Sequence, residues 1–339
     1  MTKRLPAALA AGVLVTLVCG VAGSQRTTAA GTYTLEPVAY GMQLKTPDGR
    51  VVFEYMTKKP DNIGLTAPSV ACSHPVNTPR GERITNIAPD DHPHHRGMFF
   101  GWHDAEFREP ADLARYGPNH PLFAWNITKA DFWGWGVYAP RDGRVIQNRD
   151  IRVTSADASR AQVEIHNDWN VGNRRMADES DVAAVSEHDG VYVLDLDYRL
   201  TPVADYVLYK SAFGGFALQA RKDGESYYAT SAGRNMLPDP HYSVPELNLP
   251  PAPWYDYTIK LAGNGKTLGA AVLDHPTNPP STWHNARYLW MLNPSISALG
   301  TYTVKANTTL RLRYRVVVHD GDTPTALLQK LSDEWRAVK

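Results

Sequence analysis

The sequence predicts an all-β protein, a large two-layer antiparallel β-sandwich that ends in a short C-terminal helix. Apolar and polar residues alternate over several segments, which is the pattern of strands with one buried face. Turn formers are frequent, with 25 Gly and 25 Pro among 339 residues, and strand-favouring aromatic residues reach 10%. The C-terminal segment shows the spacing of an amphipathic helix, and residues 111–116 are a candidate for a shorter one.

Residues 1–30 are predicted to be a secretory signal peptide. After a basic start, residues 5–21 are apolar, and Thr-Ala-Ala at 28–30 offers a small-residue cleavage site. A membrane anchor is the alternative, and Cys19 leaves a lipid anchor open. We therefore expect a secreted or periplasmic protein in which residues 31–339 form a single β-sandwich domain.

The first paired strands are predicted at residues 40–45 and 51–56, because the Asp-Gly pair at 48–49 is a strong hairpin signal. Residues 145–153 follow a second turn signal and are predicted to be a strand, as are residues 161–169. These segments supply strands for the two layers.

Residues 192–200 and 310–318 alternate apolar and polar side chains and are predicted to be half-buried strands. One helix should follow, with Thr323 as its N-cap and Pro324 at its first position. Its apolar stripe consists of Leu327, Leu331 and Trp335, spaced four residues apart. We expect this helix to pack against the outside of the sheets.

Charge and motifs exclude several functions. The 35 Lys and Arg residues balance the 35 Asp and Glu residues, so the basic surplus typical of nucleic-acid-binding proteins is absent. The sequence also lacks a Walker loop, a dinucleotide-binding glycine pattern, a Gly-x-Ser-x-Gly elbow and a His-Glu-x-x-His motif. We expect no nucleic-acid partner, and no membrane association beyond the signal peptide or a lipid anchor.

Histidines gather in one segment. Six of the twelve lie within residues 74–120, and the densest run is Asp-Asp-His-Pro-His-His-Arg-Gly at 90–97. This polar run opens into an apolar Met-Phe-Phe stretch, so it should lie at the mouth of a buried strand, where sites are common. If the run is extended, His92 and His94 project to one side and His95 to the other.

Two chemistries suit this cluster, and the sequence leaves both open. His92 and His94, joined by His284, could ligate one divalent metal ion. Alternatively, His94 or His95 acts as a general base, since imidazole titrates near neutral pH, and Arg96 steadies a developing oxyanion. The competing structural interpretation is that these imidazoles hydrogen-bond the backbone of loops.

A second polar segment follows a predicted buried strand at residues 267–273. It begins with Asp274 and His275 and ends at His284. We expect His284 to join the first cluster, and Asp274 and His275 to orient the imidazoles as catalytic residues. The alternative is a Pro-rich turn that contains a satisfied Asp-His pair.

Aromatic rings offer surfaces on which a sugar can stack, and Arg221 is a candidate contact for a hydroxyl or an anion. The predicted substrate-binding residues are Trp102, Trp254, Tyr255 and Arg221. The rings of Trp133 and Trp135 offer similar surfaces. The alternative for every ring is a place in the core of the sandwich.

The run at 90–97 resembles the hallmark of a secreted bacterial family of unknown function, whose domain is often labelled methane oxygenase PmoA. Three later segments resemble further hallmarks of that family: 214–221, 254–257 and 274–284. The likeness spans residues 35–320. The chain departs from the family pattern with Arg-Tyr-Leu at 287–289 and Asn-Pro-Ser at 293–295, so one wall of the pocket should differ.

The resemblance implies a large sandwich like that of galactose mutarotase and a setting in bacterial sugar catabolism. We therefore predict a secreted carbohydrate-active enzyme that performs hydrolysis, elimination or epimerisation on a sugar or glycoside. Its partner is a small sugar or a glycan, and its cofactor is one divalent metal ion or none. The alternatives are a non-catalytic glycan-binding protein and, as the family label suggests, a metal-dependent oxidoreductase.

Overall fold

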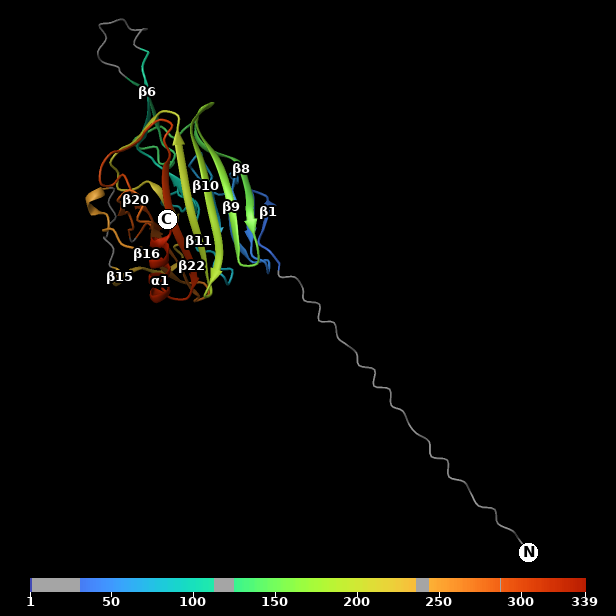
Figure 1. Cartoon of the computed structure of the whole chain (residues 1–339). Helices are drawn as coiled ribbons and strands as arrows, with labels where there is room; N and C mark the ends of the chain where they lie inside the picture. Colours follow the sequence, from blue (N-terminus) through green and yellow to red (C-terminus); the bar gives the residue numbers. More distant parts are fainter. Residues whose placement is uncertain (2–30, 113–124, 236–243, 287) are drawn as a thin grey trace. The chain divides into compact units, whose positions relative to one another are not determined.

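Two large antiparallel sheets pack face to face across a shared apolar core (Figure 1). Beyond Met1, this computed structural model describes residues 31–112, 125–235, 244–286 and 288–339. Residues Gly31–Lys339 form one compact unit. The strands within the described ranges fall into sheets of seven, nine, four and two strands. The predicted all-β sandwich with a C-terminal helix is confirmed.

The seven-stranded sheet has the order β1 (Thr34–Val38), β2 (Gly41–Lys45), β3 (Val51–Met56), β4 (Cys72–Val76), β5 (Met98–Gly101), β13 (Gly215–Gln219) and β19 (Met291–Leu292). The predicted hairpin is present, because β2 pairs with β3 and Gly49 adopts a φ of +86° in the turn between them. That backbone conformation favours glycine, which is why the Asp-Gly pair signals the turn.

The nine-stranded sheet has the order β15 (Gly233–Asn235), β14 (Gly224–Thr230), β16 (Trp254–Leu261), β17 (Thr267–Asp274), β22 (Leu310–Asp320), β11 (Val191–Pro202), β10 (Arg174–His188), β9 (Arg160–Val171) and β8 (Arg144–Ala156). Figure 1 shows β8, β9, β10 and β11 as long strands lying side by side. The predicted strands at 145–153, 161–169, 192–200 and 310–318 all lie in this sheet.

Two smaller sheets complete the β structure. A four-stranded sheet has the order β21 (Tyr302–Val304), β12 (Asp205–Leu208), β6 (Ala105–Pro110) and β7 (Trp125–Ala130). The two-stranded sheet joins β18 (Thr282–Trp283) to β20 (Pro294–Ser295), and a short 3-10 helix, η2, spans Pro245–Leu247.

The C-terminal helix α1 (Thr325–Ala337) covers part of the outer face of the nine-stranded sheet, over β11, β14, β16, β17 and β22. Its buried apolar side chains are Leu328, Leu331 and Trp335. The prediction that Thr323 caps the helix is wrong, because its hydroxyl donates to Asp256 at 2.6 Å and the N-cap position is occupied by Pro324.

The helix also explains why β22 is not the half-buried strand that its alternation predicts. One face of β22 carries core residues such as Leu312 and Val316, and the other carries Arg313 and Arg315. Helix α1 covers that second face, where both guanidinium groups lie about 5 Å from the ring centroid of Trp335. Both faces of the strand are therefore buried.

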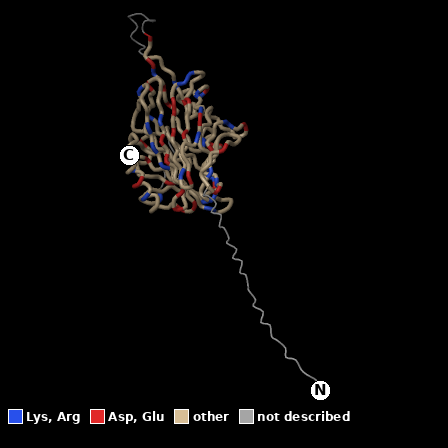
Figure 2. The backbone as a smooth tube through the Cα atoms, turned by 45° about the vertical axis from the view of Figure 1, so that its right-hand side comes forward, with Lys and Arg blue, Asp and Glu red and all other residues tan. Residues whose placement is uncertain are grey.

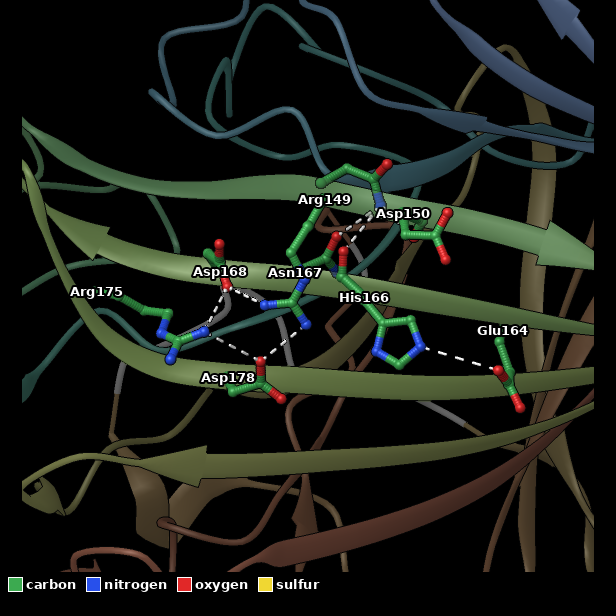
Figure 3. Close-up of polar contacts among 9 residues, drawn as sticks. Arg149, Asp150, Glu164, His166, Asn167, Asp168, Arg175 and Asp178 are labelled. Carbon is green, nitrogen blue, oxygen red and sulfur yellow. Dashed lines mark hydrogen bonds and ion pairs between the residues drawn. The ribbon is translucent and has the colours of Figure 1, made fainter.

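Cross-strand ion pairs cover the outer face of β8, β9 and β10 (Figure 3). Arg149 pairs with Asp168 at 2.7 Å and with Asp178 at 3.0 Å, and Arg152 pairs with Glu164 at 2.7 Å. Within β9, Nε2 of His166 lies 3.9 Å from Glu164. Each solvent-exposed pair contributes little to stability. Together they keep the edge of the sheet at β8 highly charged, which discourages pairing with another chain.

Basic and acidic residues are interspersed along the chain rather than gathered by sign (Figure 2). Among the described residues, no helix has the length and apolarity needed to cross a membrane.

Candidate functional site

A pocket lined by four histidines lies against the outer face of the seven-stranded sheet. The pocket encloses about 320 Å³ of empty space, including its opening to solvent. Its lining side chains are His92, His94, His95, Trp135, Phe213, His284, Leu289 and Met291. The structure therefore brings His284 to the first histidine run, which the sequence could only suggest.

Alternation along β5 places the pocket outside the sandwich. Met98 and Phe100 point into the core between the two large sheets, whereas Phe99 belongs to a separate apolar cluster with Trp133, Phe213 and other residues. That cluster forms the base of the pocket. The histidine run directly precedes β5, so the strand fixes where the imidazoles lie.

The histidine run is a turn, so the condition under which His92 and His94 would project away from His95 is not met. The backbone N–H of His95 donates to the carbonyl of His92 at 2.9 Å, and the N–H of Ala88 donates to the carbonyl of His95 at 2.8 Å. The turn gathers all three imidazoles of the run, with ring centroids 4.5 to 5.9 Å apart, instead of placing His95 on the opposite side.

Two non-glycine residues beside the pocket adopt left-handed backbone conformations. Ala88 has a φ of +47°, and Trp290, which lies between the pocket residues Leu289 and Met291, has a φ of +50°. Such strain costs on the order of 1–3 kcal/mol and gathers at functional sites in proteins. This backbone geometry supports a functional role for the pocket.

Gln219 fixes the tautomer of His95. The side-chain amide nitrogen of Gln219 donates to the carbonyl of Leu289 at 2.9 Å, so its Oε1 is the atom that faces Nδ1 of His95 at 2.7 Å. Because Oε1 can only accept, Nδ1 of His95 carries the proton and Nε2 carries the lone pair.

The same logic applies to His284. Nδ2 of Asn248 donates to the carbonyl of Ala212 at 2.7 Å, so Oδ1 of Asn248 accepts from Nδ1 of His284 at 3.0 Å. The lone pair of the neutral His284 ring is therefore on Nε2. An amide from a distant part of the chain orients each of these two imidazoles.

His92 differs because its partner is a carboxylate. Nδ1 of His92 lies 3.2 Å from Oδ2 of Asp91, and Oδ1 of Asp91 pairs with Nζ of Lys222 at 2.6 Å. A carboxylate therefore holds Nδ1 of His92, where amide oxygens hold Nδ1 of His95 and His284.

His94 and His95 are neutral imidazoles at physiological pH. Burial, followed by the nearby charges of His92 and Arg96, lowers the pKa of His94 to about 3. Burial also lowers the pKa of His95 well below its ordinary value. Within the described residues, the imidazole of His94 makes ring contacts with His92 and His95 but no hydrogen bond.

The metal-binding role of His92, His94 and His284 stays a prediction. Among the described residues, no group of three or more His, Cys, Asp or Glu side chains is arranged to hold a metal ion.

Arg96 does not reach the pocket and cannot steady an oxyanion there, contrary to the prediction. Its side chain is fully buried, with one terminal nitrogen donating to the carbonyl of Trp133 at 2.8 Å and the other to the carbonyl of Phe132 at 3.0 Å. Arg96 therefore holds the segment that leads to Trp135 on the pocket wall.

Asp274 and His275 lie away from the histidine pocket, so the structure does not support the prediction that they orient it. Asp274 accepts from Asn278 at 2.6 Å and from Ser281 at 2.8 Å, and burial raises its pKa to about 6. Nε2 of His275 lies 3.0 Å from the carbonyl of Val338. These contacts hold a turn and the C-terminus, as the structural alternative proposed.

The four predicted substrate-binding residues also lie elsewhere. Trp102 is buried in the core between the sheets, and Trp254 is buried beneath α1. Tyr255 is 1% exposed and donates to the carbonyl of Pro250. Arg221 is held by Asp223, and its other partner is the carbonyl of Arg83 at 3.1 Å. Each of the three aromatic rings is a buried packing residue, as the alternative interpretation stated.

Sequence reasoning assigned no role to the residues that orient the imidazoles. Asp91 could have been found, because it directly precedes His92. Gln219 lies in the hallmark segment 214–221, but nothing in that segment shows that it faces His95, which is 124 residues away. Asn248 lies 36 residues from His284 and belongs to no motif.

A second cavity lies between the two sheets, and its lining is mostly apolar. Its polar groups include Glu179, which accepts hydrogen bonds from Asn167 and Trp169, and Asp181, whose pKa burial raises well above its ordinary value. We place the functional site at the histidine pocket, where oriented imidazoles meet an opening to solvent.

The sequence matches the family of unknown function DUF6807 over residues 45–333, and the chain belongs to this family. That description assigns no activity and carries no methane-oxygenase label. No curated protein matches the chain.

Solved structures with a similar arrangement include a galactose mutarotase-related enzyme from Lactobacillus acidophilus, with 7% identity and a TM-score of 0.35, covering 85% of this chain and 97% of that one. An aldose epimerase homologue from C. elegans has 9% identity and a TM-score of 0.31, covering 86% and 96%. The GH36 alpha-galactosidase AgaB from Geobacillus stearothermophilus has 8% identity and a TM-score of 0.31, covering 53% of this chain. The chain spans only 28% of that galactosidase.

Proposed function

We propose that this protein is a secreted enzyme that acts on a sugar or glycoside through imidazole acid–base chemistry. One observation carries the proposal. Four imidazoles line one small pocket, and three of them have Nδ1 held by Asp91, Gln219 or Asn248. The amide partners of His95 and His284 leave the lone pair of each neutral ring on Nε2, which is what a proton acceptor requires.

The arrangement suits proton transfer. A neutral imidazole with its lone pair on Nε2 accepts a proton from a substrate, and the Asp91 carboxylate stabilises His92 while it carries that proton. Trp135 and Phe213 form an apolar wall that limits the access of water. The reaction is proton abstraction followed by epimerisation or elimination, or the hydrolysis of a glycosidic bond.

A sugar is the proposed substrate for two reasons. The segments at 90–97 and 274–284 resemble those of a family set in bacterial sugar catabolism. The pocket also combines oriented polar groups with an aromatic wall, which suits a ring that has both hydroxyl groups and an apolar face. Residues 1–30 as a signal peptide would deliver the enzyme outside the cytoplasm.

The test compares the full chain with His94→Ala and His95→Ala, using exposed His188→Ala as the matched control. Turnover of a panel of sugars and glycosides is followed by NMR, and binding is measured by calorimetry. We expect both pocket variants to lose turnover while they remain folded at the assay temperature, as thermal unfolding would show, and the control to match the wild type. Full activity in His94→Ala would refute the assignment.

Two other outcomes identify the alternatives. Binding without turnover, unaffected by either pocket substitution, would indicate a non-catalytic glycan-binding protein. One equivalent of copper or iron in the purified wild type, lost in His94→Ala, would indicate the metal-dependent oxidoreductase that the methane-oxygenase label suggests.

A further inference from the structure

A short loop with the sequence Phe-Trp-Gly-Trp-Gly-Val-Tyr, residues 132–138, forms the rim of the histidine pocket. Trp135 lines the pocket itself. Beyond it, Val137 and Tyr138 are large apolar residues that are 54% and 56% exposed. The ring centroids of Tyr138 and Trp135 lie 5.6 Å apart, so the apolar surface is continuous from the pocket wall to the exposed tyrosine.

The rim loop is held rigidly. The buried carboxylate of Asp131 accepts from the backbone N–H groups of Gly134, at 2.6 Å, and Gly136. Arg96 holds the start of the loop through two backbone carbonyls, and Arg141 donates to the carbonyl of Gly134 at 3.3 Å. Polar contacts therefore fix the backbone on either side of Trp135.

Two glycines allow the path of the loop. Gly134 and Gly136 have φ values of +103° and +76°, which other residues rarely adopt. A Cβ atom on Gly134 would lie 2.4 Å from Cβ of Ala67. The loop therefore adopts one conformation in which the apolar side chains are presented outward.

A rigid aromatic surface beside a pocket is a feature of binding sites, because a preorganised ring loses little entropy when a ligand covers it. Nothing in the fold requires Tyr138 to be aromatic. Its ring is tilted by 43° against His103 and packs in a T-shape with Trp135, and more than half of the residue faces solvent. The pocket itself is small, so a substrate longer than one ring must continue across this rim.

We propose that Trp135 and Tyr138 form a stacking platform for the sugar ring next to the one held in the pocket. The substrate is then a glycoside or glycan of at least two sugar units, whose outer ring lays its apolar C–H face on Tyr138. This proposal rests on the proposed function, and it adds the substrate class.

The experiment measures binding of six probes to the full chain by calorimetry. The probes are methyl β-glucoside, methyl β-galactoside, cellobiose, lactose, maltose and melibiose. Each is tested with the wild type, Tyr138→Ala and Tyr138→Phe, and Tyr40→Ala is the matched control because Tyr40 is a 42% exposed tyrosine. Thermal unfolding and light scattering accompany each variant.

We expect Tyr138→Ala to bind the preferred disaccharide about tenfold more weakly while its affinity for the methyl glycoside is unchanged. Tyr138→Phe keeps the ring and should bind like the wild type, as should the control. Melting temperatures should agree, because Tyr138 is exposed.

Three results would overturn the platform, and they are distinguishable. Equal disaccharide affinity in Tyr138→Ala, combined with lost turnover in His94→Ala, rejects the platform and keeps the proposed function. A wild type that binds none of the probes rejects both. A change of oligomeric state in Tyr138→Ala shows that the loop is an interface between copies of this chain.

Discussion

His74 and His103 make the stability of the fold depend on pH. Burial, with the charge of Arg83 as a second cause, lowers the pKa of His74 to about 3, and burial alone lowers that of His103 to about 3. Both are less than a tenth exposed. Below pH 6.5 these imidazoles become protonated in the unfolded chain but stay neutral in the folded chain. The free energy of unfolding therefore falls as the pH drops from 6.5 towards 3.

The magnitude follows from the distance to the ordinary pKa of histidine, about 6.5. At pH 5 the imidazole is protonated in the unfolded chain and neutral in the folded chain. Because pH 5 lies about 1.5 units below the unfolded pKa, and each unit lowers the free energy of unfolding by about 1.4 kcal/mol, protonation favours the unfolded state. Each histidine therefore contributes about 2 kcal/mol to the loss, and the pair about 4 kcal/mol. That is a large share of the roughly 5–15 kcal/mol by which domains are stable.

The assay is urea-induced unfolding at pH 7.5 and pH 5. We expect His74→Gln and His103→Gln each to remove about 2 kcal/mol of the difference between the two pH values, because glutamine hydrogen-bonds but does not titrate. His188→Gln is the control, since His188 is exposed. If the double variant loses as much stability on acidification as the wild type, the reasoning about buried imidazoles is refuted.

Three further substitutions test the packing and the site. Gly134→Ala should destabilise the protein by about 2 kcal/mol in denaturant unfolding, from its φ of +103° and a clash with Ala67; an unchanged midpoint would contradict the rim geometry. Trp335→Ala should cost about 3–5 kcal/mol by the same method, because the ring is 3% exposed under the sheet, and a cost below about 1 kcal/mol would argue against that packing. Gln219→Leu removes the acceptor of Nδ1 of His95, so nitrogen NMR of the imidazole should show the proton shifting towards Nε2. An unshifted tautomer would disprove the role of Gln219.

The strands were predictable because their signals are local. The Asp-Gly turn at 48–49 and the alternation along β11 and β22 follow from backbone conformation and side-chain period, which neighbouring residues set. The burial of both faces of β22 was not predictable, because it depends on where α1 packs.

The candidate site was predictable only in part. The cluster of His92, His94 and His95 is contiguous in sequence, and its meeting with His284 was suggested by two polar segments at strand ends. The failure at Asp274 has a long-range cause. Its strand, β17, lies in the nine-stranded sheet, whereas β5 lies in the seven-stranded sheet, and sheet membership is decided by pairing across the whole chain.

The buried guanidinium of Arg96 has a consequence for how this site can diversify. One short run of sequence supplies three imidazoles to the pocket and, through Arg96, holds the backbone of Phe132 and Trp133, which leads to Trp135 on the pocket wall. An insertion or deletion in either segment would displace the imidazoles and the aromatic wall together. We therefore expect the lengths of both loops to be fixed. New specificities should arise by exchange of exposed side chains such as Tyr138, and a graft of the site onto another sandwich must transfer both segments as one module.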